Sequence, residues 1–245
     1  MRRYAPANRF ILSLLLLIVV TAFHPPVSNL SLTGAWIYQE GNRDETVSFI
    51  EGYFVHAVYD KAGKQFFYTW GGPYELSDDK ISITIEFHSK QKERIGEKVT
   101  IPWTENNLQL VAAIDGTEHT WKQLDKGLGG LSGVWRIAGR KQGDQPVSMP
   151  LAPRRTLKIL TGTRFQWAAI NVQTGDFSGT GGGTYTFKNG QYTERIEFFS
   201  RDSSRVGASL SFNAKLQDNG REWDHSGKSS KGDPVNEMWR KLNAE

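Results

Sequence analysis

One glutamate stands out because it lies on an otherwise apolar face of the chain. Between Tyr192 and Phe198 every second residue belongs to one face of an extended strand, and that face reads Tyr192, Glu194, Ile196 and Phe198. A carboxylate among apolar neighbours is costly unless it is protonated or paired with a cation. We therefore expect Glu194 to have a partner, and the candidates are Arg164, Arg205 and His225.

Aromatic residues are expected to surround this glutamate. Trp223 and His225 share one phase and should line the same interior, to which Tyr185 and Trp167 would add aromatic walls. Apolar walls with a few convergent polar groups are typical of a small-molecule site. The predicted ligand-binding residues are Glu194, Arg205, His225, Tyr185, Trp167 and Trp223. In the alternative interpretation, Glu194 and an arginine form a buried structural pair that fixes the strand register, and no ligand binds.

More specific chemical motifs are incomplete. Gly227-Lys228-Ser229 is similar to the end of a phosphate-binding loop, but the first glycine of that loop is missing. A hydrolytic triad built on Ser229 would favour a Gly-x-Ser-x-Gly elbow around that serine, and the sequence has none there. The five histidines lack metal-ligand spacing, so the sequence predicts no metal site and no cofactor. Binding is favoured over catalysis, and the enzymatic alternative is a hydrolase or isomerase that uses Glu194 or His225 as acid or base.

The elements that would position these residues are strands. Apolar and polar residues alternate from Ile81 to His88 and from Val206 to Leu216, which is the period of a strand with one buried face. Segments 188–191 and 78–79 lie at hairpin positions, and the Asn-Gly of the first suits the positive φ of a tight turn. The only helical feature expected after residue 22 is one short turn over 235–242. Many short strands with no helix to cover a sheet favour an all-β fold of small antiparallel barrels, because closure removes the sheet edges.

The chain contains an internal duplication. The segment Leu32-Thr-Gly-Ala-Trp36 recurs as Leu131-Ser-Gly-Val-Trp135, and each half ends in a similar segment, 121–124 and 239–242. Nine of the 30 residues in 60–89 are identical to their counterparts in 171–200. The glycine-rich segment 126–130 is the predicted joint between the copies.

The second copy differs from the first in two ways. It is about 12 residues longer, and the proline-rich segment 144–155 is the predicted insertion, an exposed loop. It also carries three consecutive glycines, Gly181–Gly183, which favour a bulge that curls the sheet over close approach to a ligand.

The N-terminus has the plan of a secretory signal peptide. Arg2, Arg3 and Arg9 precede an apolar run over 10–20, and the small residues before position 23 suit cleavage after Ala22. A retained membrane anchor is the alternative, but this run is shorter than the roughly 20 apolar residues of a spanning helix. We expect a secreted or periplasmic protein with no transmembrane domain after cleavage. Without cysteine, the mature chain must be held by its core rather than by disulfides.

The two copies carry opposite charge. Residues 30–126 hold 10 Lys and Arg against 15 Asp and Glu, whereas residues 127–245 hold 17 against 11. This asymmetry can mean that the halves dock on each other, that the second half has an anionic partner, or simply that surface charges have drifted. The basic residues are dispersed, so no nucleic-acid partner is expected.

Each copy opens with Gly-x-Trp, at Gly34/Trp36 and Gly133/Trp135, and this resembles the opening of lipocalin and calycin barrels. The resemblance implies that each tryptophan plugs one end of a barrel and that a basic residue of the last strand packs over it. The candidates for that residue are Lys122, Arg240 and Lys241. Segments 158–167, 181–185, 192–202 and 225–233 also resemble uncharacterised bacterial secreted proteins with a lipocalin-like fold. That resemblance implies location and fold, and no activity.

The sequence therefore predicts a signal peptide over 1–22 and two tandem lipocalin-like β-barrels over 30–126 and 131–245. The first expectation for function is binding of a small amphipathic or anionic ligand in the second barrel. The first copy has Ile83 where the second has Glu194 and would be its structural partner. The alternative is a structural or protein-interaction module with plugged barrels, whose exposed loops bind a protein partner.

Overall fold

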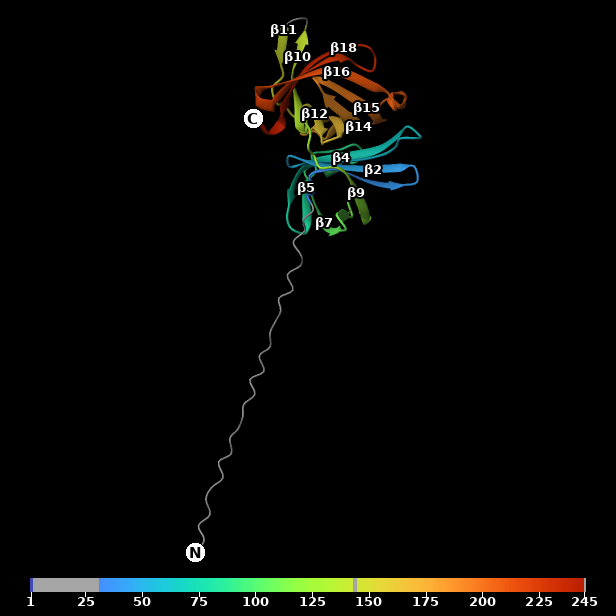
Figure 1. Ribbon diagram of the computed structural model, residues 1–245, viewed down its shortest axis with the longest axis vertical. Coiled ribbons are helices and arrows are strands. Elements are labelled where there is room, and N and C mark those ends of the chain that lie inside the picture. The colour runs from blue at the N-terminus through green and yellow to red at the C-terminus, as the bar shows by residue number, and fades with distance from the viewer. Residues whose placement is uncertain (2–30, 143–144, 245) are drawn as a thin grey trace.

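A computed structural model of the chain describes residue 1, residues 31–142 and residues 145–244. Apart from residue 1, the predicted signal peptide lies outside the described residues. The strands form two closed, eight-stranded antiparallel barrels that follow one another along the chain (Figure 1). The expected all-β fold of two tandem barrels is thereby confirmed.

The first barrel runs up and down in sequence order and closes where its first strand pairs with its last. Its strands are β1 (Gly34–Glu40), β2 (Arg43–Ile50), β3 (Tyr53–Asp60), β4 (Gln65–Leu76), β5 (Lys80–Thr84), β7 (Lys98–Asn106), β8 (Gln109–Ala112) and β9 (His119–Asp125). The short β6 (Phe87–His88) pairs with β4, and the 3₁₀ turn η1 (Lys92–Arg94) follows it.

The second barrel repeats this order and closes between its own first and last strands. Its strands are β10 (Gly133–Gln142), β12 (Arg154–Leu160), β13 (Arg164–Asn171), β14 (Asp176–Lys188), β15 (Gln191–Phe199), β16 (Ser209–Gln217), β17 (Glu222–Lys228) and β18 (Pro234–Lys241). Three further 3₁₀ turns are η2 (Ser203–Arg205), η3 (Asp218–Gly220) and η4 (Leu242–Ala244).

Two local expectations need correction. The segment 235–242 forms strand β18 rather than a helical turn, because its alternate residues Val235 and Trp239 pack in the barrel core. The predicted loop over 144–155 is partly a strand, since β11 (Gln145–Ser148) pairs with the end of β10. Only residues 149–153 connect β11 to β12 without regular structure.

The two opening tryptophans have the same local structure. The indole nitrogen of Trp36 donates to the carbonyl oxygen of Leu32 at 2.9 Å, and that of Trp135 donates to Leu131 at 2.8 Å. Both indoles are fully buried. The ammonium group of Lys241 lies 4.6 Å from the ring centroid of Trp135, so the second barrel has the basic residue expected over its tryptophan.

The glycines of the repeat mark a bulge, as predicted. The pairing of β14 with β15 shifts register between Gly182 and Gly183. Gly183 has a φ of 156°, and a Cβ atom there would lie 2.0 Å from the carbonyl oxygen of Arg195. The predicted Asn-Gly hairpin also forms, with positive φ at both Asn189 and Gly190.

The barrels pack wall against wall, β2–β4 and β6 of the first against β12–β15 of the second. The interface is largely apolar, and its buried residues are Ile50, Tyr53, Val55, Ala57, Tyr59 and Phe87 from the first barrel and Val134, Leu157, Ile159, Ala168, Ile170 and Phe198 from the second. Strand β3 is therefore buried on both of its faces. This packing places the two barrels of Figure 1 in direct contact.

Candidate ligand site at one end of the first barrel

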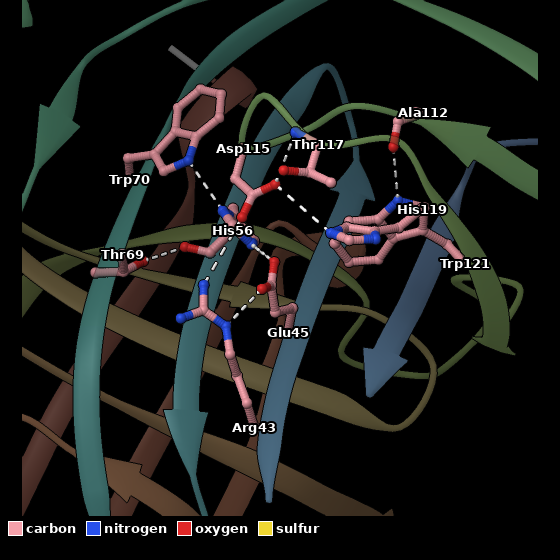
Figure 2. Close-up of polar contacts among 10 residues, drawn as sticks. All are labelled: Arg43, Glu45, His56, Thr69, Trp70, Ala112, Asp115, Thr117, His119 and Trp121. Atoms are coloured by element: carbon pink, nitrogen blue, oxygen red, sulfur yellow. Dashed lines mark hydrogen bonds and ion pairs between the residues drawn. The ribbon is translucent and has the colours of Figure 1, made fainter. Parts of the chain in front are cut away.

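A buried polar pair lies inside the first barrel. Glu45 on β2 and His56 on β3 face the interior, and their side chains are 2% and 0% exposed. His56 Nε2 lies 3.2 Å from Glu45 Oε2, and the indole nitrogen of Trp70 on β4 donates to His56 Nδ1 at 3.0 Å. Figure 2 shows the resulting chain Trp70–His56–Glu45 across three neighbouring strands.

The hydrogen bonds fix the tautomer of His56. An indole N–H can only donate, so Nδ1 must be the accepting nitrogen of the ring. The proton then resides on Nε2, which donates to Glu45. Both ring nitrogens are committed, which holds the imidazole in place and leaves it no free nitrogen for proton transfer.

Three more polar residues extend this pair towards solvent: Arg43 on β2, Asp115 in the β8–β9 connection and His119 on β9. Arg43 Nε donates to Glu45 at 2.7 Å, and its Nη2 lies 3.7 Å from Asp115. Burial would raise the pKa of Glu45, but the hydrogen bonds from His56 and Arg43 outweigh it and hold this pKa below its ordinary value. Glu45 is thus an ionised carboxylate neutralised from within the site. We call Arg43, Glu45, His56, Asp115 and His119 the polar cluster.

The polar cluster offers three side chains that could bind a metal, but Arg43 competes with a metal for two of them. Ligand atoms of Glu45, Asp115 and His119 all lie within 4.8 Å of one another, as oxygen, oxygen and nitrogen. Figure 2 shows the Arg43 guanidinium in contact with both carboxylates. A divalent cation would have to displace this guanidinium, so the donor set does not fit a resident metal.

A cavity of about 530 Å³ adjoins the polar cluster. It lies where the β6–β7 and β8–β9 connections meet, at one end of the barrel. Its apolar walls come mainly from inward-facing side chains, namely Tyr68, Trp70, Val99, Ile101 and Ile114. Trp70 and Asp115 belong both to the cavity wall and to the hydrogen-bonded network, so they connect the two.

The cavity rim carries two cations and one histidine. Lys90 lies 5.6 Å above the ring of Tyr68 and forms no ion pair among the described residues, whereas Arg94 is bound to Glu97. Nδ1 of His88 accepts from the backbone N–H groups of Lys90 and Gln91, both at 3.1 Å. Burial, with a smaller contribution from Arg94, lowers the pKa of His88 to about 4. The positive charge at the rim therefore comes from Lys90 and Arg94.

Glu194, the residue that first suggested a site, is inside the second barrel and paired. Lys158 donates to its Oε1 at 2.9 Å, and the hydroxyl of Tyr192 donates to the same oxygen at 2.9 Å. The Lys158 ammonium also lies within 5.5 Å of the ring centroids of Tyr192, Trp223 and Trp239. The carboxylate thus has a cation, though not one of the three expected partners: Arg164 bonds Glu197, and Arg205 bonds Asp202.

Most of the other predicted residues also lie in the core of the second barrel. Trp223 is fully buried, Tyr185 donates to the carbonyl of Thr161, and Trp167 packs against Phe199. Arg205 lies in η2, outside the barrel interior that holds Glu194. The structure therefore gathers five of the predicted residues around one core and separates Arg205 from them; the five are Glu194, Tyr185, Trp167, Trp223 and His225.

Two of the predicted residues, His225 and Trp223, have unmet hydrogen-bonding capacity among the described residues, and His225 has the more of it. His225 is 4% exposed, and neither ring nitrogen has a hydrogen bond among the described residues. Its Nδ1 lies 3.5 Å from Oε2 of Glu237, an ion-pair distance rather than a good hydrogen bond. Burial, with a contribution from Lys158, lowers the pKa of His225. It also lines a cavity of about 490 Å³ together with residues of β10, β11, β16 and β18.

Sequence reasoning missed the polar pair of the first barrel. It compared the copies at one position, where Ile83 is indeed buried and apolar, and so treated the first interior as apolar. The available signal was His56 itself, which occupies the position equivalent to Trp167 within a strand of otherwise apolar residues.

Comparisons with known proteins add no family. No family model matches the chain, and no curated protein matches it either. Among the described residues, no helix is long and apolar enough to cross a membrane. The function must therefore be inferred from the geometry of the chain itself.

Proposed function

We propose that this chain is a secreted, lipocalin-like binding protein that holds a small amphipathic anion at one end of its first barrel. The observation that carries the proposal is the cavity of about 530 Å³ with aromatic and aliphatic walls and a cationic rim. Pockets of roughly 300–1,000 Å³ with apolar walls and a few polar groups are typical of small-molecule sites.

The cavity walls suggest the orientation of the ligand. Trp70, Ile101 and Ile114 would contact an apolar body, because they are the buried part of the lining. Lys90 would meet an anionic group at the rim, since its ammonium has no carboxylate partner among the described residues. In the second barrel the Lys158–Glu194 pair and its aromatic neighbours occupy the space around Glu194, and the cavity beside His225 has two carboxylates, Asp224 and Glu237, in its lining. We therefore place the anion in the first barrel.

The geometry of the polar cluster supports a binding function better than a catalytic one. A general base needs a ring nitrogen or carboxylate that can reach the substrate. Both nitrogens of His56 are engaged by Trp70 and Glu45, and Glu45 is in turn engaged by Arg43. These bonds support a rigid wall for the cavity.

Two related dyes test the proposal: anionic 1-anilinonaphthalene-8-sulfonate and the uncharged N-phenyl-1-naphthylamine. Fluorescence titration should show that both bind with about 1:1 stoichiometry. Lys90→Gln should weaken binding of the sulfonate dye about fivefold or more. It should leave binding of the neutral dye unchanged, because only the sulfonate has a charge that the lysine ammonium can attract. Ala113→Trp, which fills the cavity, should weaken both.

The matched control is Lys80→Gln, an exposed lysine of the same barrel outside the cavity. It should leave both affinities unchanged. If neither dye binds, or if Lys80→Gln has the same effect as Lys90→Gln, the proposed ligand site is wrong.

A further inference from the structure

A separate cavity on the second barrel is lined by an unusual concentration of arginines. It has a volume of about 400 Å³ and lies under the segment that connects β11 to β12. Five arginines line it: Arg136, Arg140, Arg154, Arg155 and Arg201. None of the described lining residues is acidic, so the positive charge is not balanced within the cavity wall.

The partners of these arginines leave much of their donor capacity available. Arg155 bonds Glu86 of the first barrel, and Arg140 lies 3.7 Å from Glu237. Arg201 donates through Nε to a backbone carbonyl, that of Ser178. Arg154 makes no hydrogen bond or ion pair with the described residues and is exposed. Since each guanidinium has five N–H donors, at least Arg154 and Arg201 can bind a further acceptor.

The surroundings make additional negative charge favourable. Burial lowers the pKa of Arg136 and of Arg155, which means that the site disfavours the charges it holds. A concave surface with charges of one sign focuses the field and attracts a counter-ion of the opposite sign. An oxyanion in this cavity would offset the cost of burying the charges of Arg136 and Arg155.

The remaining lining narrows the class of anion. Ile137, Ile170 and Leu151 add apolar surface to the cavity, so a ligand with an apolar body would gain contacts that a bare ion would not. The planar guanidinium matches the oxygens of phosphate in a bidentate way. We propose that this cavity binds the phosphate group of a small phosphate monoester, with the ester's apolar group against Ile137, Ile170 and Leu151.

This assignment is separate from the docking of the two barrels. Of the five arginines, Arg155 bonds a residue of the first barrel, Glu86. Another charged contact, of Lys61 and Arg164 with Glu197, lies at a different point of the interface and uses none of the five. The positive excess of the second copy is thus divided between an interface and a cavity. It is also independent of the proposed function, because no residue lines both this cavity and the one in the first barrel.

Isothermal titration with phenyl phosphate and with inorganic phosphate, at low salt, tests the inference. Phenyl phosphate should bind saturably at 1:1 and more tightly than inorganic phosphate. The double variant Arg154→Gln/Arg201→Gln should weaken phenyl phosphate by about tenfold or more, since each lost charge-assisted bond weakens binding. Both arginines are exposed, so this variant should fold.

The matched control is Arg195→Gln/Arg221→Gln, which removes two exposed arginines of the same barrel that lie outside the cavity. It should bind phenyl phosphate as the parent protein does. If the control weakened phenyl phosphate binding equally, the effect would come from net charge alone and the proposal would be overturned. An absence of saturable binding to the parent protein would overturn it too. Phenyl phosphate is itself a small amphipathic anion, so all of these titrations are made in the background of Ala113→Trp, which fills the cavity of the first barrel; a failure at one cavity is then distinguishable from a failure at the other.

Discussion

The Lys158–Glu194 pair shows how far a single residue can be interpreted from sequence. The strand period indicated that Glu194 faces the core, and the need for a cation followed from the cost of a buried charge. The identity of the cation did not follow, because it depends on which strands face each other across the barrel. In the first barrel the equivalent positions are Val47 and Ile83, so an apolar combination in one copy replaces a charged one in the other.

This replacement leads to a stability prediction. Lys158→Met should destabilise the protein by about 3–5 kcal/mol, because it leaves the buried carboxylate of Glu194 without its cation. The triple variant Lys158→Met/Glu194→Leu/Tyr192→Phe removes the charge pair and the hydroxyl bonded to it. It should recover most of that loss, since an apolar core often replaces a buried ion pair at little cost. Urea unfolding measures both variants, and a triple variant no more stable than the single one would contradict the argument.

His88 gives a pH prediction. Its pKa of about 4 in the folded protein lies below the ordinary value of about 6.5 in the unfolded chain. Between these values the unfolded state binds more protons, so stability should fall as the pH falls from about 6.5 through about 4, by about 3 kcal/mol. NMR titration of the His88 ring measures the pKa directly.

The control for His88 is His88→Asn, whose side-chain oxygen can still accept from the backbone N–H groups of Lys90 and Gln91. It should flatten the loss of stability over this pH range, because the variant has no imidazole to protonate. An imidazole that titrates near 6.5 would show that the ring is not held as an acceptor.

Strands with one wet face were the elements most readily predicted from sequence. The alternation in β5 and β16 and the Asn-Gly turn before β15 are local signals, and each gives the element found. Strand β3 shows the limit, because its two faces contact the barrel core and the second barrel. With both faces buried it has no alternation, so the period does not show that His56 faces the barrel core rather than the second barrel. The candidate site was therefore missed where the second barrel covers the first.

The bulge glycine of β14 gives a prediction about an element. Gly183→Ala would place a Cβ atom 2.0 Å from a backbone carbonyl of β15, and neither strand can move without disturbing the barrel. We expect a loss of several kcal/mol, well above the roughly 1 kcal/mol of an ordinary positive-φ glycine. Gly41→Ala is the comparison, since Gly41 has a φ of 58° and open space around it. Similar melting temperatures for the two variants would mean that the β14–β15 bulge adapts.

The interface joins the two copies through residues that the repeat alignment had already paired. Glu86 and Glu197 are identical positions of the duplication, and each accepts hydrogen bonds from the other barrel. The sequence showed that these positions match and that the halves differ in charge. The sequence did not show which walls of the barrels meet, because the outer faces that form the interface are as apolar as the barrel cores and cannot be distinguished from them by pattern. Docking thus accounts for part of the charge asymmetry that the sequence left open.

The whole molecule is expected to unfold as one unit, and Glu197 tests this. Glu197 accepts from Tyr59 and Lys61 of the first barrel and pairs with Arg164, whose side chain is 10% exposed. Burial would raise the pKa of Glu197, but Arg164 and Lys61 outweigh it and lower this pKa, so the bonds stabilise the protein above the unfolded pKa of about 4.3 and weaken as the pH falls below it. At neutral pH Glu197→Gln should cost about 3 kcal/mol.

Hydrogen exchange shows where that loss is felt. If the barrels unfold together, protection in β3 of the first barrel should fall as much as protection in β13 and β15 of the second. Glu86→Gln is the control, because the Glu86–Arg155 pair is more exposed and should cost less. Loss confined to the second barrel would mean that each copy holds its own fold and that the interface only aligns them. An equal loss of protection in both barrels would mean that the apolar residues of the interface form a core that both barrels share. Each barrel then depends on the other to keep its apolar outer face away from water.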